Sequence, residues 1–339
     1  MLALVVFAQL FSSGLSPVEL GRTPTVMISA ETCVGCHATV HGEWQKSGHG
    51  QAWTDAIFQR EYRERPLAWC VHCHAPLAQQ LAEVRAGGGR LANEGVTCAV
   101  CHVREGKILA ARRRATSPHV TVADESFGGP QFCAGCHQFN FPRFASDGKT
   151  VVGYGPVPMQ NTVSQHAAGP DAETPCLSCH GRSPSRHRMP GAHDPEMLGR
   201  AFGVSVCRSG AAVVVRVENR GAGHRLPTGD VHRHLALRVW RPSTPERLWE
   251  QLWLRRFRAL DGGGKEQVED TTLAPRERRL SRIELASLGG ASDEPVSTEL
   301  RLVFTIDEFP LPTRPLDAPS YAVVWRDSRR FSDMDACPE

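Results

Sequence analysis

The stretch ETCVGCHATVHGEWQKSGHGQAW, residues 31–53, contains two cysteines, three histidines and two tryptophans. Cys33, Cys36 and His37 form the pattern C-x-x-C-H, which is the attachment signature of c-type haem. The two thiols of this pattern form thioethers with the haem vinyl groups, and the adjacent histidine binds the iron from one face. The stretch therefore predicts a covalent haem site, and it leaves His41 and His49 to be explained.

The same pattern occurs five times, in motif 1 (33–37), motif 2 (70–74), motif 3 (98–102), motif 4 (133–137) and motif 5 (176–180). Zinc knuckles also use paired cysteines, but they do not place histidine directly after every second one. We therefore expect five haem c groups on ten thioether cysteines: Cys33, Cys36, Cys70, Cys73, Cys98, Cys101, Cys133, Cys136, Cys176 and Cys179. The expected proximal iron ligands are His37, His74, His102, His137 and His180.

The spare histidines are candidates for the second axial position of each iron. The chain has 15 histidines, so ten remain for at most five distal positions. His49 follows His37 by twelve residues, which is about 18 Å along a helix, whereas two ligands of one iron are only ~4 Å apart. We therefore expect His49 to bind the iron of another motif, and His41 to lie on the surface or beside a propionate. Met159 and Met189 are competing ligands that flank motif 5.

Two cysteines, Cys207 and Cys337, lie outside the motifs. In an exported protein they are expected to form a disulfide that closes most of the C-terminal region. The alternative is a pair of unpaired thiols that are buried as small hydrophobic side chains.

The N-terminal residues 2–11, LALVVFAQLF, are apolar and long enough for the core of a signal peptide, but too short to span a bilayer. We expect residues 1–22 to be a signal peptide. A short apolar anchor is the alternative, because neither a preceding basic residue nor an A-x-A cleavage site is present. The expected location of the protein is the periplasm or another extracytoplasmic space. Partner proteins that hold the chain at a membrane are the alternative to a freely diffusing protein.

The composition changes near residue 200. Residues 25–200 contain all five motifs and show little periodicity, with roughly 30 residues for each haem. We expect them to form a domain of turns and short helices around the cofactors. One such helix is expected over 76–85. Residues 201–339 contain alternating stretches, AAVVVRVEN, HLALRVW, LRLVFTI and YAVVWR, which predict an antiparallel β-sandwich. The expected fold class is α+β with two domains, a pentahaem cytochrome c domain followed by the sandwich.

Three segments resemble one protein family: CVGCHATVHGEWQKSGHGQAW (33–53), MQNTVSQHAAGPDAETPCLSCHGRSPSRHRMPGAHDPEML (159–198) and NRGAGHRLPTGDVHRHLALRV (219–239). They are similar to multihaem c-type cytochromes related to the tetrahaem nitrification cytochrome, many of which end in a β-rich domain. The resemblance implies electron transfer and the distal ligands His49, His166, His193 and His224, with His187 competing against His193. His119 is the fifth candidate, because it lies between motifs 3 and 4. A simple Pro-Gly turn is the alternative for GHRLPTGD.

The expected function is an electron carrier or conduit between redox partner proteins, rather than an enzyme. Two alternatives stay open: a multihaem oxidoreductase whose one open haem acts on a small nitrogen or sulfur species, and a haem subunit of a membrane electron-transfer complex or of a self-assembling cytochrome polymer. The formal charge of +3 falls to about −2 when five ferric haems with ionised propionates are included. No feature favours nucleic-acid binding.

Overall fold

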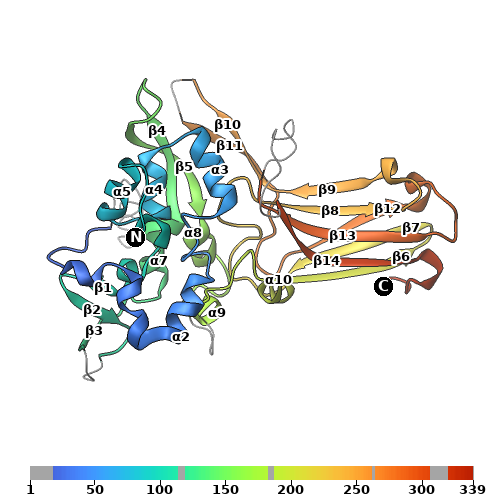
Figure 1. Cartoon of the computed structure of the whole chain (residues 1–339). Helices are drawn as coiled ribbons and strands as arrows, with labels where there is room; N and C mark the ends of the chain where they lie inside the picture. Colours follow the sequence, from blue (N-terminus) through green and yellow to red (C-terminus); the bar gives the residue numbers. More distant parts are fainter. Residues whose placement is uncertain (1–17, 114–118, 182–186, 262–263, 306–319, 339) are drawn as a thin grey trace, which may run out of the picture. The chain divides into compact units, whose positions relative to one another are not determined.

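The computed structural model describes residues 18–113, 119–181, 187–261, 264–305 and 320–338, so most of the apolar segment expected at 1–22 lies outside the described residues. The chain has an α+β fold and divides into two compact units (Figure 1). Unit 1 comprises Met1–Val163, Glu173–Gly191 and Leu260–Lys265, and unit 2 comprises Ser164–Ala172, Ala192–Ala259 and Glu266–Glu339. Within the described ranges, no helix is long and apolar enough to cross a membrane.

Each C-x-x-C-H motif of unit 1 overlaps a short helix. Residues three apart lie on the same face of a helix, so both cysteines of a motif point to one side. The histidine is the last helical residue in four motifs, and His37 has non-helical backbone angles (φ −120°, ψ 38°) at a kink inside its helix. The five helices are α2 (Val34–Gln45), α4 (Ala68–His74), α6 (Cys98–His102), α7 (Pro130–His137) and α9 (Leu177–His180).

The remaining elements of unit 1 are also short. The helix expected over 76–85 is confirmed as α5 (Ala78–Arg85). The other elements are α3 (Ala56–Glu64), the 3-10 turns η1 (Thr25–Met27), η2 (Ala30–Thr32) and η3 (Ala92–Glu94), the small sheet β1 (Val103–Arg104), β2 (Lys107–Ala110) and β3 (Thr121–Ala123), and the antiparallel pair β4 (Gln138–Phe144) and β5 (Val151–Asn161).

Unit 1 has little apolar core of its own. Two small clusters of buried side chains lie among the motif helices. The first consists of Leu20, Ile28, Leu77, Ala99, Val100 and Val103, and the second of Trp53, Val71, Ala75, Leu81 and Ala92. Clusters of this size bury little apolar surface, and the free energy of folding that they contribute is correspondingly small.

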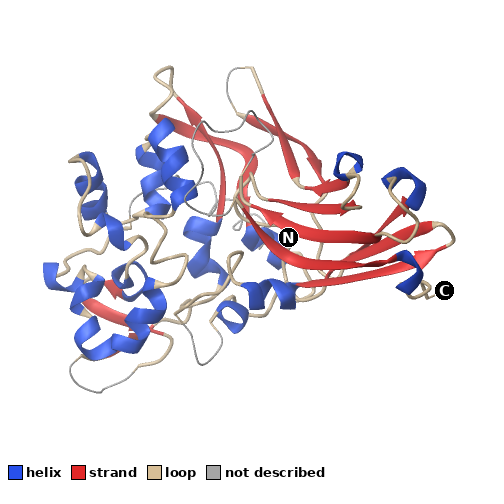
Figure 2. Cartoon of the chain, turned by 45° about the vertical axis from the view of Figure 1, so that its right-hand side comes forward, coloured by secondary structure: helices blue, strands red, loops and turns tan. Residues whose placement is uncertain are grey.

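Unit 2 contains two antiparallel sheets (Figure 2). The three-stranded sheet has the order β12-β7-β6 and the four-stranded sheet the order β14-β13-β8-β9. The strands are β6 (Phe202–Ser209), β7 (Ala212–Asn219), β8 (His234–Trp240), β9 (Trp249–Trp253), β12 (Arg278–Glu284), β13 (Pro295–Val303) and β14 (Tyr321–Arg330). β10 (Arg255–Ala259) pairs with β11 (Lys265–Asp270). The other elements are α8 (Thr162–Ala167), α10 (Pro195–Ala201), η4 (Pro245–Arg247), η5 (Leu285–Leu288) and η6 (Phe331–Asp333).

The alternation of the sequence places one face of each sheet in the core. Val213, Val215 and Val217 of β7 are fully buried, as are Leu235, Leu237 and Val239 of β8, each at 0% exposure. Successive side chains of a strand point to opposite faces, so these positions line a single face of each sheet. Unit 2 therefore has the continuous apolar core that unit 1 lacks.

The C-terminal segment is attached to the outer edge of β6. Cys207 and Cys337 form a disulfide between residues 130 positions apart. On either side of it, the Arg208 amide donates to the Asp335 carbonyl at 2.8 Å, and the Cys337 amide donates to the Arg208 carbonyl at 2.9 Å. The segment thus satisfies backbone groups that an edge strand otherwise leaves open to another chain.

The Cys207→Ser variant is expected to unfold at a lower temperature, because the disulfide closes a long loop and the chain-entropy contribution for such a loop is about 4 to 5 kcal/mol. Thermal denaturation followed by circular dichroism measures the change, while the visible spectrum of the haems should stay the same. Rapid alkylation of both thiols in the native protein without reductant would show that the bridge does not form.

Candidate functional site

Hydrogen bonds orient three of the five motif histidines. The Nδ1 atom of His74 lies 2.7 Å from the Ala52 carbonyl, that of His102 2.9 Å from the Leu109 carbonyl, and that of His180 2.7 Å from the Pro190 carbonyl. A carbonyl only accepts, so each ring carries its proton on Nδ1. In the neutral ring, Nε2 is then the nitrogen without a proton, and it is the atom that can bind a metal.

Each of three motif histidines lies opposite a second histidine ring from a distant segment. The ring centroids of His37 and His119 are 6.0 Å apart, those of His102 and His187 are 6.1 Å apart, and those of His137 and His49 are 6.2 Å apart. All three pairs lie within unit 1.

These separations fit two imidazoles on opposite sides of one iron. Iron to nitrogen bonds of ~2 Å put the two nitrogens ~4 Å apart, and each ring centre lies roughly 1 Å further out, which gives about 6 Å between centroids. The residues of motifs 1, 3 and 4 therefore fit a haem with two histidine ligands. His49 lies opposite His137 of motif 4, and its place as an iron ligand stays a prediction.

Burial keeps two of these histidines in the neutral form that a ligand needs. It lowers the pKa of His49, and the neighbouring His180 lowers it further. Burial also lowers the pKa of His102, an effect that the hydrogen bond to Leu109 opposes. An imidazole that resists protonation stays available to a metal as the pH falls.

Thiols of different motifs are in contact. Cys33 of motif 1 is hydrogen-bonded to Cys98 of motif 3, and Cys176 of motif 5 to Cys133 of motif 4; each contact lowers the pKa of the first thiol to about 7. Cys73 of motif 2 is hydrogen-bonded to Cys136 of motif 4. These contacts bring the attachment cysteines of three pairs of motifs together: motif 1 with motif 3, motif 2 with motif 4, and motif 4 with motif 5. Motif 4 has two such neighbours.

A four-residue stretch, which we call the 187–190 segment, contacts ligand histidines of several motifs. His187 faces His102 of motif 3, and its backbone amide donates to the Glu43 carboxylate at 3.1 Å. Two positions later, the Met189 Sδ atom lies 2.8 Å from Nδ1 of His49, and the next carbonyl, that of Pro190, orients His180 of motif 5. The sequence suggested Met189 as an iron ligand, but its sulfur contacts an imidazole.

The other distal candidates lie in unit 2. The ring of His193 packs on Phe304 with centroids 4.1 Å apart. His166 lies at the end of α8 against Gly223, where an added β-carbon would come 3.2 Å from the His166 ring. His224 has its Nδ1 atom 2.9 Å from the Arg225 carbonyl, the arrangement seen at the motif histidines. These three histidines stay predictions as iron ligands.

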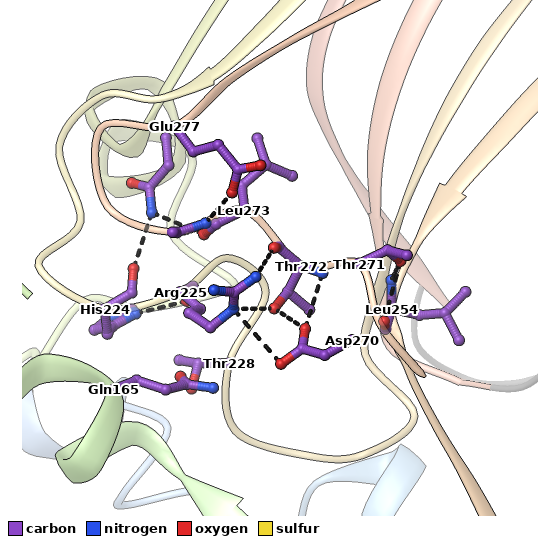
Figure 3. A network of polar contacts seen from close by, with 12 residues as sticks. Gln165, His224, Arg225, Thr228, Leu254, Asp270, Thr271, Thr272, Leu273 and Glu277 are labelled. Atoms are coloured by element: carbon purple, nitrogen blue, oxygen red, sulfur yellow. Dashed lines mark hydrogen bonds and ion pairs between the residues drawn. The ribbon is translucent and has the colours of Figure 1, made fainter. Parts of the chain in front are cut away.

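A polar network fixes the loop that carries His224 (Figure 3). The Arg225 guanidinium donates to the Thr272 hydroxyl at 2.7 Å and is paired with Asp270 at 3.6 Å. The Thr228 hydroxyl donates to the Gln165 side chain at 2.6 Å. The stretch GHRLPTGD is therefore an anchored loop, and the peptide bond Leu226–Pro227 within it is cis. Asp270 and Thr272, which anchor it, belong to a segment in which no sequence motif was identified.

The structure corrects one sequence prediction in unit 1, the position of His41, and adds one residue that the sequence did not single out, Glu94. The prediction that His41 lies on the surface is wrong, because its side chain is buried (8% exposed) against Trp44. The Nε2 atom of His41 lies 3.5 Å from the Glu31 carboxylate. Glu94 is a buried carboxylate that accepts from the Ser29 hydroxyl at 2.5 Å and from the Ala30 amide at 2.7 Å. It fixes the turn that leads into motif 1. Neither role has a local sequence signal.

The chain is similar to known cytochromes in part of its sequence and in its fold. Residues 32–103, which include motifs 1 to 3, match the family described as cytochrome c554 and c-prime. No curated protein matches the chain. The fold is similar to that of the penta-heme cytochrome c552 from Thermochromatium tepidum, at 19% identity and a TM-score of 0.66, over 90% of this chain and 99% of that one. These findings support a multihaem c-type cytochrome.

Replacement of His49, His119 or His187 by alanine is expected to convert one of the five irons from low spin to high spin, because each variant leaves one motif histidine without an opposing imidazole. The visible and electron paramagnetic resonance spectra of the ferric protein measure the effect. His232→Ala is the control, because this histidine lies in unit 2 and belongs to none of the three ring pairs. A fully low-spin His119→Ala protein would remove that histidine from the ligand set.

Proposed function

We propose that the chain is an electron carrier or conduit that holds five c-type haems, most of them between two histidines. When bound, haem iron supplies reversible one-electron redox chemistry. The observation that carries the proposal is the set of three histidine pairs with ring centroids 6.0 to 6.2 Å apart, each formed by a motif histidine and a residue from a distant segment.

The chain's own residues explain why transfer is favoured over catalysis. In the three pairs, histidines on both sides of an iron would occupy the positions where a substrate binds. The hydrogen bonds from Nδ1 to the carbonyls of Ala52, Leu109 and Pro190 hold the motif imidazoles in one orientation, so little reorganisation accompanies a change of charge. The thiol contacts link motif 3 to motif 1, and motif 4 to motifs 2 and 5, which gives two groups of close sites.

The finer features of the proposal follow from the sequence. Five C-x-x-C-H motifs predict five haems, and the neighbour from Thermochromatium tepidum is described as penta-heme. His166, His193 and His224 remain the distal candidates outside the three pairs. We propose that the two sheets of unit 2 form a β-sandwich, that the protein is exported to the periplasm or another extracytoplasmic space, and that its partners are redox proteins, either free or in a membrane complex or cytochrome assembly.

The mass of the exported protein under denaturing conditions should exceed that of the processed polypeptide by five haem groups, because all ten motif cysteines are available as thiols. Intact-mass spectrometry measures the difference. A Cys133→Ala/Cys136→Ala variant should lose one haem mass and keep four. A wild-type protein with four or fewer haems would mean that one motif is not used.

If all five irons are held between two histidines, the ferric protein should be low-spin throughout and carbon monoxide should barely change the spectrum of the reduced protein, because no coordination position would be open. Absorption and resonance Raman spectra decide this. A high-spin component that binds carbon monoxide, nitrite or hydroxylamine in the wild-type protein would reveal an open haem and replace the conduit by an oxidoreductase.

A further inference from the structure

The Nδ1 atom of His49 has an unusual neighbour. The motif histidines His74, His102 and His180 each face a backbone carbonyl through this atom, and a carbonyl is a strong acceptor. His49 instead faces the thioether sulfur of Met189 at 2.8 Å. A thioether is a weak acceptor. The imidazole opposite motif 4 therefore differs in its hydrogen bonding from these three motif imidazoles.

The backbone of Met189 indicates that this contact is a built feature. Met189 has φ +43°, in the left-handed region that residues with a β-carbon rarely adopt. Residues held there cluster at functional sites, where the surrounding structure maintains them. Here the conformation presents the Met189 sulfur to His49 while the next carbonyl, that of Pro190, faces His180. A two-residue turn thus serves the ligand histidines of two neighbouring motifs.

The acceptor on Nδ1 changes how strongly the imidazole donates electrons to iron. A strong acceptor makes the ring more basic, and a more basic ring stabilises the ferric state. A weak acceptor has the opposite effect and raises the reduction potential, for which second-sphere hydrogen bonding is an established lever.

We propose that Met189 is a positioning residue that raises the reduction potential of the iron between His49 and His137 above the value that a carbonyl acceptor would give. The inference rests on the proposed function, because it requires His49 to be an iron ligand. Motif 4 contacts both motif 2 and motif 5 through its cysteines. A raised potential at this junction would favour residence of an electron at motif 4 more than a carbonyl acceptor on His49 would.

The test replaces the thioether by a stronger acceptor or by none. Met189→Gln offers an amide carbonyl to Nδ1 and should lower one of the five midpoint potentials, with a change of about tenfold in the equilibrium constant for reduction, or ~59 mV. Met189→Leu keeps the apolar volume and should leave that potential unchanged or higher. Met197→Gln is the matched control, because the Met197 sulfur also accepts a hydrogen bond, from Arg200, and lies in unit 2. Spectroelectrochemical titration gives the potentials.

The outcomes separate this inference from the proposed function. A low-spin Met189→Gln protein with all five potentials unchanged overturns the role of Met189 and leaves the conduit intact. A His49→Ala protein that stays fully low-spin removes His49 as a ligand and overturns both. In the His49→Ala background, Met189→Gln should no longer shift any potential, and a shift that persists would place the effect elsewhere. Met189→Gln could instead displace His49 and produce a high-spin signal. The Met189→Leu variant then decides the question. A lowered midpoint potential in Met189→Leu overturns the inference, and an unchanged or raised midpoint potential upholds it.

Discussion

The close approach of three pairs of histidine rings, at the spacing that one metal would impose on two imidazoles, is the constraint on which the rest of unit 1 depends. Three pairs of rings about 6 Å apart join residues that are far apart in sequence: His37 with His119, His49 with His137, and His102 with His187. The apolar clusters of this unit are small, so long-range order has to come from elsewhere. Metal ligation can supply it, because a ligand pair that closes only in the folded state adds its binding free energy to folding.

Unit 2 is organised by a different interaction, the burial of alternate branched side chains in two sheets. On the face of β13 opposite Leu300, the side chain of Glu299 is fully buried between the guanidinium groups of Arg301 and Arg326. A buried carboxylate is tolerated only when it is paired and hydrogen-bonded in this way. One chain therefore combines a unit whose order suits a cofactor with a unit that has an ordinary apolar core.

Sequence reasoning succeeded where the signal is local. The C-x-x-C-H motifs, the helix at 78–85 and the strands around AAVVVRVEN, HLALRVW and YAVVWR are each specified by residues within a few positions of one another. The hairpin β4–β5, the burial of His41 and the roles of Glu43 and Glu94 were missed, because each depends on a partner far along the chain. The same limit applies to the distal ligands: a lone histidine such as His119 has no pattern around it, and only tertiary geometry sets its ring opposite His37.

The position of the 187–190 segment has a consequence for how such a protein matures. The segment follows all five attachment motifs, and it provides the ring opposite His102, the contact to His49 and the carbonyl that orients His180. In a chain that emerges from a membrane with its N-terminus first, motifs 3 and 4 would thus receive their thioether bonds before these late contacts exist. Covalent attachment would then keep the porphyrin of motif 3 on the chain during a period when its proposed second ligand, His187, is still on the other side of the membrane.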